Sequence, residues 1–392
     1  MRPLTEANVT GKRVLVREDL NVPMQQGNVA DMKRVDASLP TLRYLAEHGA
    51  RTIIVSHLGR PDGTPNAKYS LKPVADALSK RLAMDVTFAS DCVGEPARAA
   101  VESMKDGSIV LLENVRFHAG EESNDPAFAK ELASLADVYV NDAFGTAHRA
   151  HASTEGVAHL LPAYAGFLMQ AEIDALSRLV NDPAQPYVCV IGGAKVKDKV
   201  GVFNQLMEKV RTFCIGGGMA NTFLAAQGVD VGKSLRDDDL GPATKILEAA
   251  SARGVTLLLP VDAVVSDSFD NDAGAHVVDL ADVGSNMILD IGPKSADIYA
   301  KAIEDAQTVV FNGPMGVYEK AAYRAGTKRV GEAMAAATRK GATTVVGGGD
   351  AAAAAEELAF ADKVTHVSTG GGATLEFLEG KTLPGIKALN AG

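Results

Sequence analysis

The chain has no tryptophan and little cysteine. Of its 392 residues, 5% are aromatic and only 3 are cysteines. Cys92, Cys189 and Cys214 stand apart among apolar residues without C-x-x-C spacing, so the sequence indicates neither a zinc site nor a disulfide framework. We expect three reduced thiols in the core.

An excess of positive charge is also missing. The formal net charge is -10 at pH 7, whereas proteins that bind nucleic acids or membrane surfaces hold these anionic partners with fields of Lys and Arg. We therefore expect neither partner, and any anionic ligand must meet a local cationic pocket. No apolar run approaches the length of a membrane span, and Met1–Glu6 contains no apolar signal stretch, so the expected location is the cytoplasm.

Several nucleotide-binding signatures are absent. There is no G-x-x-x-x-G-K-[ST] and no H-R-D or D-F-G element, which excludes P-loop NTPases and protein kinases. Gly347–Ala352 loosely matches the G-x-G-x-x-A of dinucleotide dehydrogenases, but Asp350 stands where a pyrophosphate would press. A two-domain anion receptor without catalysis is the other alternative. Turnover with ATP and Mg²⁺ would indicate a kinase, NAD reduction a dehydrogenase, and binding alone a receptor.

What is present is a regular alternation of short β-branched runs with longer helical patterns. This alternation is typical of parallel sheets covered by helices on both faces, and the length suggests two domains. We expect an α/β fold of two Rossmann-like, doubly wound parallel-sheet domains with a cleft between them. The expected strands are Arg13–Arg17, Arg51–His57, Asp85–Ala89, Ser108–Glu113, Val138–Asn141, Tyr187–Ile191, Thr212–Ile215, Thr256–Pro260, Thr308–Asn312, Thr343–Val346 and Thr365–Ser368.

A helix is predicted to join the two domains. Ile173, Leu176 and Leu179 lie on one helical face, and Asn181–Pro183 is a stop signal. We expect a linker over 170–185 between domains 1–169 and 186–375. The alternative is one more surface helix of a single large domain.

Three glycine triplets each close an apolar run in the second half of the chain: Gly216–Gly218, Gly347–Gly349 and Gly370–Gly372. Glycine allows positive φ and close approach of backbone amides, and a helix N-terminus offers unpaired N–H groups to phosphate. A single triplet is more typical of a tight turn. Three of them predict a nucleotide site.

Charged residues near these glycines support that prediction. Lys195 and Lys199 are expected one helical turn apart on a shared face, where they repel each other unless an anion lies between them; an exposed lysine pair is the alternative. Asp350 follows a triplet and precedes an alanine-rich helix, as an N-cap residue would. A carboxylate beside phosphates also suggests a bridging Mg²⁺, so we expect both capping and metal contact.

The first half places arginine and histidine after its strands, in Arg17–Asn21, His57–Arg60, Asn114–His118 and Asn141–His151. Because ligands bind beyond the carboxyl ends of strands in open α/β sheets, these side chains are expected to form one pocket. The fixed donor fork of Arg suits a small, highly charged anion. By sequence pattern alone, Arg34 is a helix-surface charge.

Eight segments in order together resemble the phosphoglycerate kinase family: Val16–Pro23, Ser56–Gly63, Leu111–Phe117, Asn141–His151, Gly192–Lys199, Asn312–Glu319, Gly347–Asp350 and Ser368–Gly372. The resemblance implies reversible phosphoryl transfer between the acyl phosphate of 1,3-bisphosphoglycerate and Mg-ADP, giving 3-phosphoglycerate and Mg-ATP. It also suggests a monomer whose C-terminal tail, from about 376 to 392, returns to the first domain.

By the same resemblance, the residues that bind the three-carbon acid are Asp19, Leu20, Asn21, Arg34, His57, Leu58, Gly59, Arg60, Arg116 and Arg149. Those that bind the nucleotide are Lys195, Lys199, Gly216, Asn312, Pro314, Gly316, Val317, Glu319, Gly347, Gly348, Gly349, Asp350 and Ala351. Glu319 is expected at the ribose and Asp350 at Mg²⁺. The groups expected to act on the migrating phosphoryl are Arg34, Lys195 and the amides at Gly348–Gly349 and Gly371–Gly372, so that Gly349 and Gly372 count as catalytic with Arg34 and Lys195.

Two positions depart from the family pattern. Glu18 stands where an apolar residue is usual, and Ala351 replaces a Ser or Thr that follows Asp350. The missing hydroxyl removes one hydrogen bond to the nucleotide phosphates or the metal shell, so Ala351→Ser is expected to tighten nucleotide binding.

Overall fold

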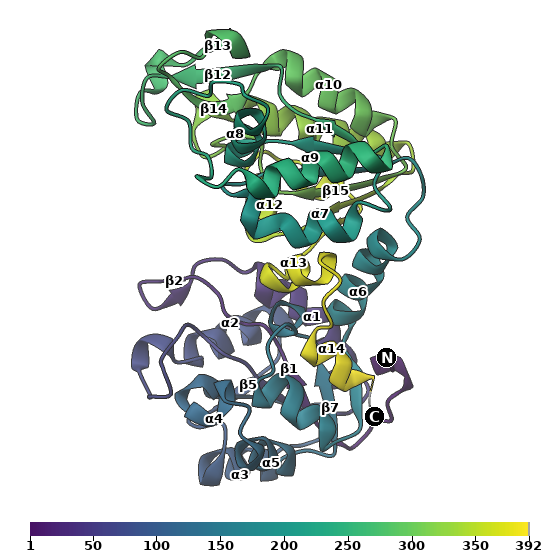
Figure 1. Cartoon of the computed structure of the whole chain (residues 1–392). Coiled ribbons are helices and arrows are strands. Elements are labelled where there is room, and N and C mark those ends of the chain that lie inside the picture. The colour runs from purple at the N-terminus through teal and green to yellow at the C-terminus, as the bar shows by residue number, and fades with distance from the viewer. Residues whose placement is uncertain (391–392) are drawn as a thin grey trace. The chain divides into compact units, whose positions relative to one another are not determined.

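A computed structural model of the chain describes residues 1–390 (Figure 1). The chain forms two compact units: the first contains Met1–Asp174 and the described residues from Thr382 onward, and the second contains Ala175–Lys381. Helix α6 (Phe167–Val180) runs through the boundary at residue 174. It begins three residues before the predicted Gln170 and ends where Asn181–Pro183 predicts.

The first unit is built on a six-stranded parallel sheet with the order β5-β6-β4-β1-β7-β8. The strands are β1 (Arg13–Arg17), β4 (Arg51–Val55), β5 (Val86–Ala89), β6 (Ile109–Leu112), β7 (Val138–Asn141) and β8 (Ala163–Ala165). The main helices are α1 (Lys33–Glu47), α2 (Lys72–Leu82), α3 (Gly94–Glu102), α4 (Ala119–Glu122), α5 (Pro126–Ser134) and α14 (Pro384–Leu389). Every residue of β6 and β7 is buried, as expected for strands covered on both faces.

The second unit contains another six-stranded parallel sheet, with the order β11-β10-β9-β15-β16-β17. Its strands are β9 (Tyr187–Ile191), β10 (Thr212–Ile215), β11 (Thr256–Leu258), β15 (Thr308–Asn312), β16 (Thr343–Val346) and β17 (His366–Val367). The helices are α7 (Val200–Leu206), α8 (Gly217–Ala226), α9 (Gly241–Arg253), α10 (Pro293–Glu304), α11 (Ala325–Arg339), α12 (Gly349–Glu357) and α13 (Gly372–Leu378). One large core cluster joins β9, β15 and β16 to α10 and α11.

The predicted α/β class with two doubly wound parallel sheets is confirmed, and each predicted strand is present. Several strands are shorter than predicted. The strand expected over Arg51–His57 ends at Val55, so His57 belongs to the loop beyond the sheet. A ligand-binding residue at that point is free of the strand's hydrogen-bond ladder.

The structure also has elements that the sequence did not predict. A three-stranded antiparallel sheet, β13-β12-β14, joins β12 (Asp262–Ser266), β13 (His276–Asp279) and β14 (Met287–Ile291) in the second unit. A short hairpin pairs β2 (Met24–Gln25) with β3 (Asn28–Val29), and β8 adds an edge strand to the first sheet. These strands lack the alternation with helices on which the prediction rested.

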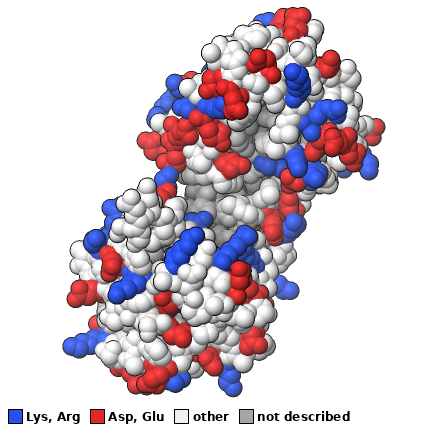
Figure 2. Space-filling view, turned by 90° about the vertical axis from the view of Figure 1, so that its left-hand side faces the viewer, with Lys and Arg blue, Asp and Glu red and all other residues white. Residues whose placement is uncertain are grey.

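The three cysteines are free and buried, as predicted. Acidic and basic side chains are interspersed on the face shown in Figure 2, which displays no broad field of one sign. Within residues 1–390, no helix combines the length and the apolar character that a membrane crossing requires.

Candidate functional site

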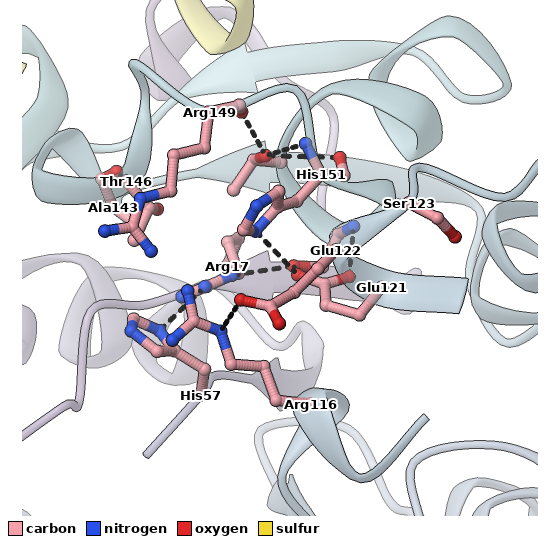
Figure 3. Close-up of polar contacts among 12 residues, drawn as sticks. Arg17, His57, Arg116, Glu121, Glu122, Ser123, Ala143, Thr146, Arg149 and His151 are labelled. Carbon is pink, nitrogen blue, oxygen red and sulfur yellow. Dashed lines mark hydrogen bonds and ion pairs between the residues drawn. The ribbon is translucent and has the colours of Figure 1, made fainter. Parts of the chain in front are cut away.

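The first unit gathers a basic cluster at the carboxyl ends of its central strands. We use this name for Arg17, Arg34, His57, Arg116 and Arg149. Figure 3 shows the side chains of Arg17, His57 and Arg116 close together, with His151 beside them. These residues come from β1, α1 and the loops that follow β4, β6 and β7.

Arg34 holds the loop after β1, which carries Asp19 and Asn21, and this loop in turn contacts the loop after β4. Its Nη1 donates to Asp19 Oδ1 at 2.8 Å and to the carbonyl of Asn21 at 3.2 Å. Asn21 Oδ1 in turn accepts from the amide of Gly59 at 2.8 Å. Arg34 is therefore more than a helix-surface charge, because its guanidinium holds Asp19 and the backbone of Asn21.

Leu20 and Leu58 lie differently from their neighbours. Both side chains are buried in the apolar core between the sheet and the helices α1 and α2. Their backbone groups are also engaged, since the amide of Leu20 donates to Ser56 Oγ and the carbonyl of Leu58 accepts from Asn114 Nδ2. These leucines anchor the loops, and their side chains do not face the basic cluster.

Arg116 is a buried cation, only 3% exposed. Its Nη1 donates to the carbonyl of Gly59 at 2.9 Å, and its Nε lies 3.2 Å from Glu122 Oε1. Nη2 is buried without a hydrogen-bond partner among the described residues. Burial lowers the pKa of Arg116, yet the group remains charged because a guanidinium titrates far above neutral pH.

The remaining predicted arginines are more accessible. Arg149 is half-buried and donates from Nε to His148 Nε2 at 3.3 Å. Arg60 is exposed at the end of the loop that begins at His57. Neither arginine forms an ion pair with a carboxylate among the described residues, so each can bind a ligand without giving up such a pair.

Together with burial, the arginines of the basic cluster lower the pKa of His57 and of the neighbouring His151. Burial lowers the pKa of His57 well below its usual value, and four arginines lower it further. These are Arg17, Arg116, Arg149 and Arg34. Burial and neighbouring arginines likewise lower the pKa of His151 to about 4. Because these cations disfavour another positive charge, the site favours an anion.

The sequence pattern placed Arg17 in the expected pocket of the first half, but the family resemblance did not count it among the residues that bind the acid. The structure buries Arg17, at 1% exposure, between His57 and Ser153. The carboxylates Glu121 and Glu122 were also missed, and they lie beside the same arginines (Figure 3). A charged residue at the last position of a buried strand was the available signal for Arg17.

In the second unit, each glycine triplet leads from a strand into a helix, as predicted. Gly216, Gly348 and Gly371 are the N-cap residues of α8, α12 and α13. The last two have φ of 107° and 51°, where a side chain is strained. Gly349 and Gly372 are the exposed first residues of their helices, where backbone N–H groups have no partner within the helix.

A cavity of about 620 Å³ lies beside the starts of α8 and α12 and is lined there by Gly217, Gly218 and Asp350. Apolar groups such as Leu235, Phe269 and Val317 line most of it, and its polar groups include Glu319 and Asp350. Of the other predicted nucleotide residues, Pro314 and Gly316 line this cavity. Gly216 is buried just behind the wall, where an added Cβ would lie 2.8 Å from Met315 Cα.

Gly316 is the wall residue with the least room for a side chain. A Cβ there would lie 2.5 Å from both Leu289 O and Asp290 Oδ1, so Gly316→Ala must displace the cavity wall. We expect Mg-ATP affinity, measured by calorimetric titration, to fall at least about tenfold, the effect of losing about one well-placed contact. Gly254→Ala strains a backbone with φ of 67° but meets open space, so this control should lose stability while keeping affinity. Equal affinity of Gly316→Ala and the parent chain would contradict the expectation.

The lysines do not share a helical face, and that prediction is wrong. Val196–Lys199 forms a 3₁₀ turn before α7, Lys195 is exposed, and Lys199 turns inward. Lys199 Nζ donates to the carbonyl and the Oδ1 of Asn312, whose Nδ2 donates to Gly347 O at 2.6 Å. Burial lowers the pKa of Lys199 to about 8. The hydrogen bonds of Asn312 thus connect the 3₁₀ turn that contains Lys199 to Gly347, the first residue of the second glycine triplet.

Asp350 does not cap α12, which corrects half of the prediction for it. Gly348 is the N-cap residue, and the Asp350 side chain makes no capping hydrogen bond. Its carboxylate is exposed in the first turn and lines the cavity. An accessible carboxylate beside a phosphate site fits Mg²⁺, which takes one or two carboxylates together with phosphate oxygens and water.

Ala351 is 1% exposed and packs within the large apolar core cluster of the second unit. A serine at this position would place its hydroxyl group next to apolar side chains. The structure therefore gives no support to the expected contact between such a hydroxyl and the phosphates. The amide of Ala351, in the first turn of α12, is the group nearer to that role.

A basic cluster beside one doubly wound sheet, and an apolar cavity at glycine-led helix starts beside the other, define a two-unit α/β protein. Comparison with known proteins gives the class a name. The family model of phosphoglycerate kinase matches residues 4–381. The chain is 54% identical to the phosphoglycerate kinase of Moorella thermoacetica over 98% of both chains, and 53% identical to that of Chloroflexus aurantiacus over 99% of this chain and 98% of the other.

Solved structures agree. The phosphoglycerate kinase of Coxiella burnetii superposes with a TM-score of 0.91 at 43% identity, over 99% of this chain and 98% of the other. The phosphoglycerate kinase of Pyrococcus horikoshii superposes with a TM-score of 0.85 at 34% identity, over 100% of this chain and 98% of the other.

The chain belongs to the phosphoglycerate kinase family. It is a phosphotransferase with a carboxyl acceptor, which transfers a phosphoryl group reversibly between 1,3-bisphosphoglycerate and ADP in glycolysis, with ATP or ADP as co-substrate and Mg²⁺ as cofactor. The dehydrogenase and receptor alternatives are thereby excluded.

Proposed function

We propose that the two units divide this reaction between them. The unit predicted as 1–169 with the tail from about 376 binds 3-phosphoglycerate, the unit predicted as 186–375 binds the Mg-nucleotide, and 170–185 links them. The observation that carries the proposal is the contrast between the basic cluster of the first unit and the apolar cavity of the second.

The acid is bound by Asp19, Asn21, Arg34, His57, Arg60, Arg116 and Arg149. Two features support this assignment. Arg116 Nη2 is a buried donor without a partner in the part of the chain that the structure describes, and such a group gains most when an anionic oxygen reaches it. Besides burial, the positive charge of neighbouring arginines lowers the pKa of His57. The same positive charge attracts an acid that carries a phosphate.

The nucleotide is bound by the remaining predicted residues of the second unit. The flat, apolar base packs against the side chains of Leu235 and Val317, and Glu319, which lines the same cavity, accepts from the ribose hydroxyls. The phosphates lie near the helix starts at Gly216 and Gly348, with Mg²⁺ held by Asp350. The bound ion neutralises part of the phosphate charge.

Phosphoryl transfer requires mainly alignment and charge stabilisation from the protein. We assign the stabilising charges to Arg34 and Lys195 and the stabilising amides to Gly349 and Gly372. Since a phosphoryl group passes only between molecules in contact, both ligands have to meet these groups during the reaction.

Arg34→Ala tests the division of binding. Losing a charge-assisted contact to the acid should weaken 3-phosphoglycerate binding by about 10²-fold, while the dissociation constant of Mg-ADP stays within about twofold of the parent. Both constants can be measured by calorimetric titration with one ligand at a time. Arg43→Ala, an exposed position on the same helix, should change neither. Retained acid binding, or an equal loss of Mg-ADP binding, would refute the assignment.

The proposal also includes a monomeric enzyme in the cytoplasm, without nucleic-acid or membrane partners. The net charge of -10 and the mixed surface charges in Figure 2 support it. Sedimentation equilibrium gives the test of the oligomeric state, for which a mass of 40.8 kDa is expected.

A further inference from the structure

Arg17 is the one member of the basic cluster without an assigned function. Its guanidinium is buried, and all three nitrogens have partners. Nε donates to Ser153 Oγ at 2.8 Å, Nη1 donates to the carbonyl of Glu18, and Nη2 lies 3.0 Å from His57 Nδ1.

Ser153, which accepts from Arg17, is itself held in place by Glu121. Ser153 Oγ donates to Glu121 Oε1 at 2.6 Å, and its amide donates to Glu121 Oε2 at 2.8 Å. Glu121 is fully buried. A buried series of hydrogen bonds therefore connects Glu121 through Ser153 to Arg17 and His57. These bonds leave Arg17 little freedom to turn away from the imidazole.

The contact between Arg17 and His57 has one possible direction. A guanidinium carries only donors, so its Nη2 must donate and His57 Nδ1 must accept. An accepting Nδ1 carries no proton, which leaves the ring proton on Nε2. Which nitrogen of a histidine is protonated is set by the partner of the other nitrogen.

We propose that Arg17 is a positioning residue that holds His57 as the neutral tautomer with its proton on Nε2. This inference rests on the proposed function, in which His57 contacts the three-carbon acid. The acid then meets an uncharged N–H donor of fixed direction rather than an imidazolium. Positive charge for the acid comes from the arginines, which do not titrate in the physiological range.

The other charged groups around His57 agree with this assignment. Arg116, Arg149 and Arg34 all disfavour a second proton on the ring. The nearby carboxylates are engaged elsewhere: Asp19 pairs with Arg34, and Glu122 lies against Arg116. Burial of the ring acts in the same direction as the arginines.

The direct test is ¹H–¹⁵N NMR of the histidine rings in the intact enzyme without ligand, with His57→Gln used to assign the signal. We expect a protonated Nε2 and an unprotonated Nδ1 at every pH from 5.5 to 8. A proton on Nδ1, or titration of the ring near its ordinary pKa of about 6.5, would overturn the proposal. This readout does not depend on acid binding, so it is independent of the proposed function.

Arg17→Met tests the cause. Without the donor, His57 should show a mixture of tautomers, and KM for 3-phosphoglycerate should rise about two- to tenfold, the value of about one hydrogen bond. Arg17→Lys, which keeps a donor, should restore most of the Nε2 tautomer. Arg13→Met, on the same strand but paired with Asp137, is the control and should leave the His57 signal unchanged. An unaltered tautomer in a folded Arg17→Met variant would contradict the positioning role, whereas a correct tautomer with no response to added 3-phosphoglycerate would contradict only the proposed function.

Discussion

Replacing Lys195 by alanine is expected to lower kcat by about 10²–10³-fold, as for other lost transition-state donors. The side chain of Lys195 is exposed and makes no hydrogen bond or ion pair among residues 1–390, so truncating it breaks no polar contact of the folded protein. The free energy of unfolding should therefore change by less than about 0.5 kcal/mol. Steady-state kinetics in both directions, with urea unfolding of the same samples, measure the two quantities.

Lys197 provides the matched control. It is exposed in the 3₁₀ turn that begins directly after Lys195, and Lys197→Ala removes the same charge two residues further along the chain. Its kcat should stay within about threefold of the parent, a shift of less than about 1 kcal/mol. Near-normal turnover of Lys195→Ala, or equal losses in the two variants, would remove Lys195 from the catalytic groups.

The second large effect is expected at Glu18, one of the two departures from the family pattern. Glu18 is fully buried, and neither of its carboxyl oxygens has a hydrogen-bond partner of good geometry within residues 1–390. Burial raises its pKa well above the usual value, and the neighbouring Asp142 raises it further. Burial also raises the pKa of Asp142 to about 6. Each carboxyl group is therefore more easily protonated in the folded chain than in the unfolded chain.

The sign of the pH dependence follows from these raised pKa values. Stability from the protonated carboxyl groups is complete below their unfolded pKa values, near 4, and is lost as the pH rises through the folded values. The loss is about 1.4 kcal/mol for each pH unit in which one group is protonated in the folded state and ionised in the unfolded state.

Glu18→Gln keeps a possible amide donor to Asp142 and removes one of the two titrations. We expect its gain in unfolding free energy over the parent chain to be larger at pH 7.5 than at pH 5, by about 1.4 kcal/mol for each pH unit over which Glu18 is protonated in the folded chain and ionised in the unfolded chain. Urea unfolding at the two values measures this difference. Glu131→Gln, at an exposed position of α5, should show no such difference. A Glu18→Gln gain that is the same at both pH values would show that Glu18 does not titrate abnormally in the folded chain.

The sequence predicted the parallel strands well because each is a short β-branched run between polar segments. It predicted the basic cluster for a related reason, since the carboxyl ends of parallel strands meet at one edge of the sheet. The antiparallel sheet of β12, β13 and β14 was missed because these strands follow one another without an intervening α-helix, so the alternation on which the prediction rested is absent there.

The errors at the site have physical causes. Lys199 was placed on one helical face with Lys195, but the 3₁₀ turn directs it inward to Asn312. Asp350 was read as a cap, but the chain enters α12 at Gly348, whose φ of 107° suits glycine. Arg17 was expected in the pocket but without a specific role, because its contacts are with His57 and Ser153, which lie 40 and 136 residues away along the chain.

Hydrogen exchange with each ligand added separately tests the division between the units most directly. We predict that 3-phosphoglycerate slows exchange of backbone amides in Arg17–Asn21 and His57–Arg60, and that Mg-ADP alone slows exchange in Gly216–Gly218 and Gly347–Ala351. Protection of the same unit by both ligands, or no protection of the glycine segments at saturating Mg-ADP, would contradict the account.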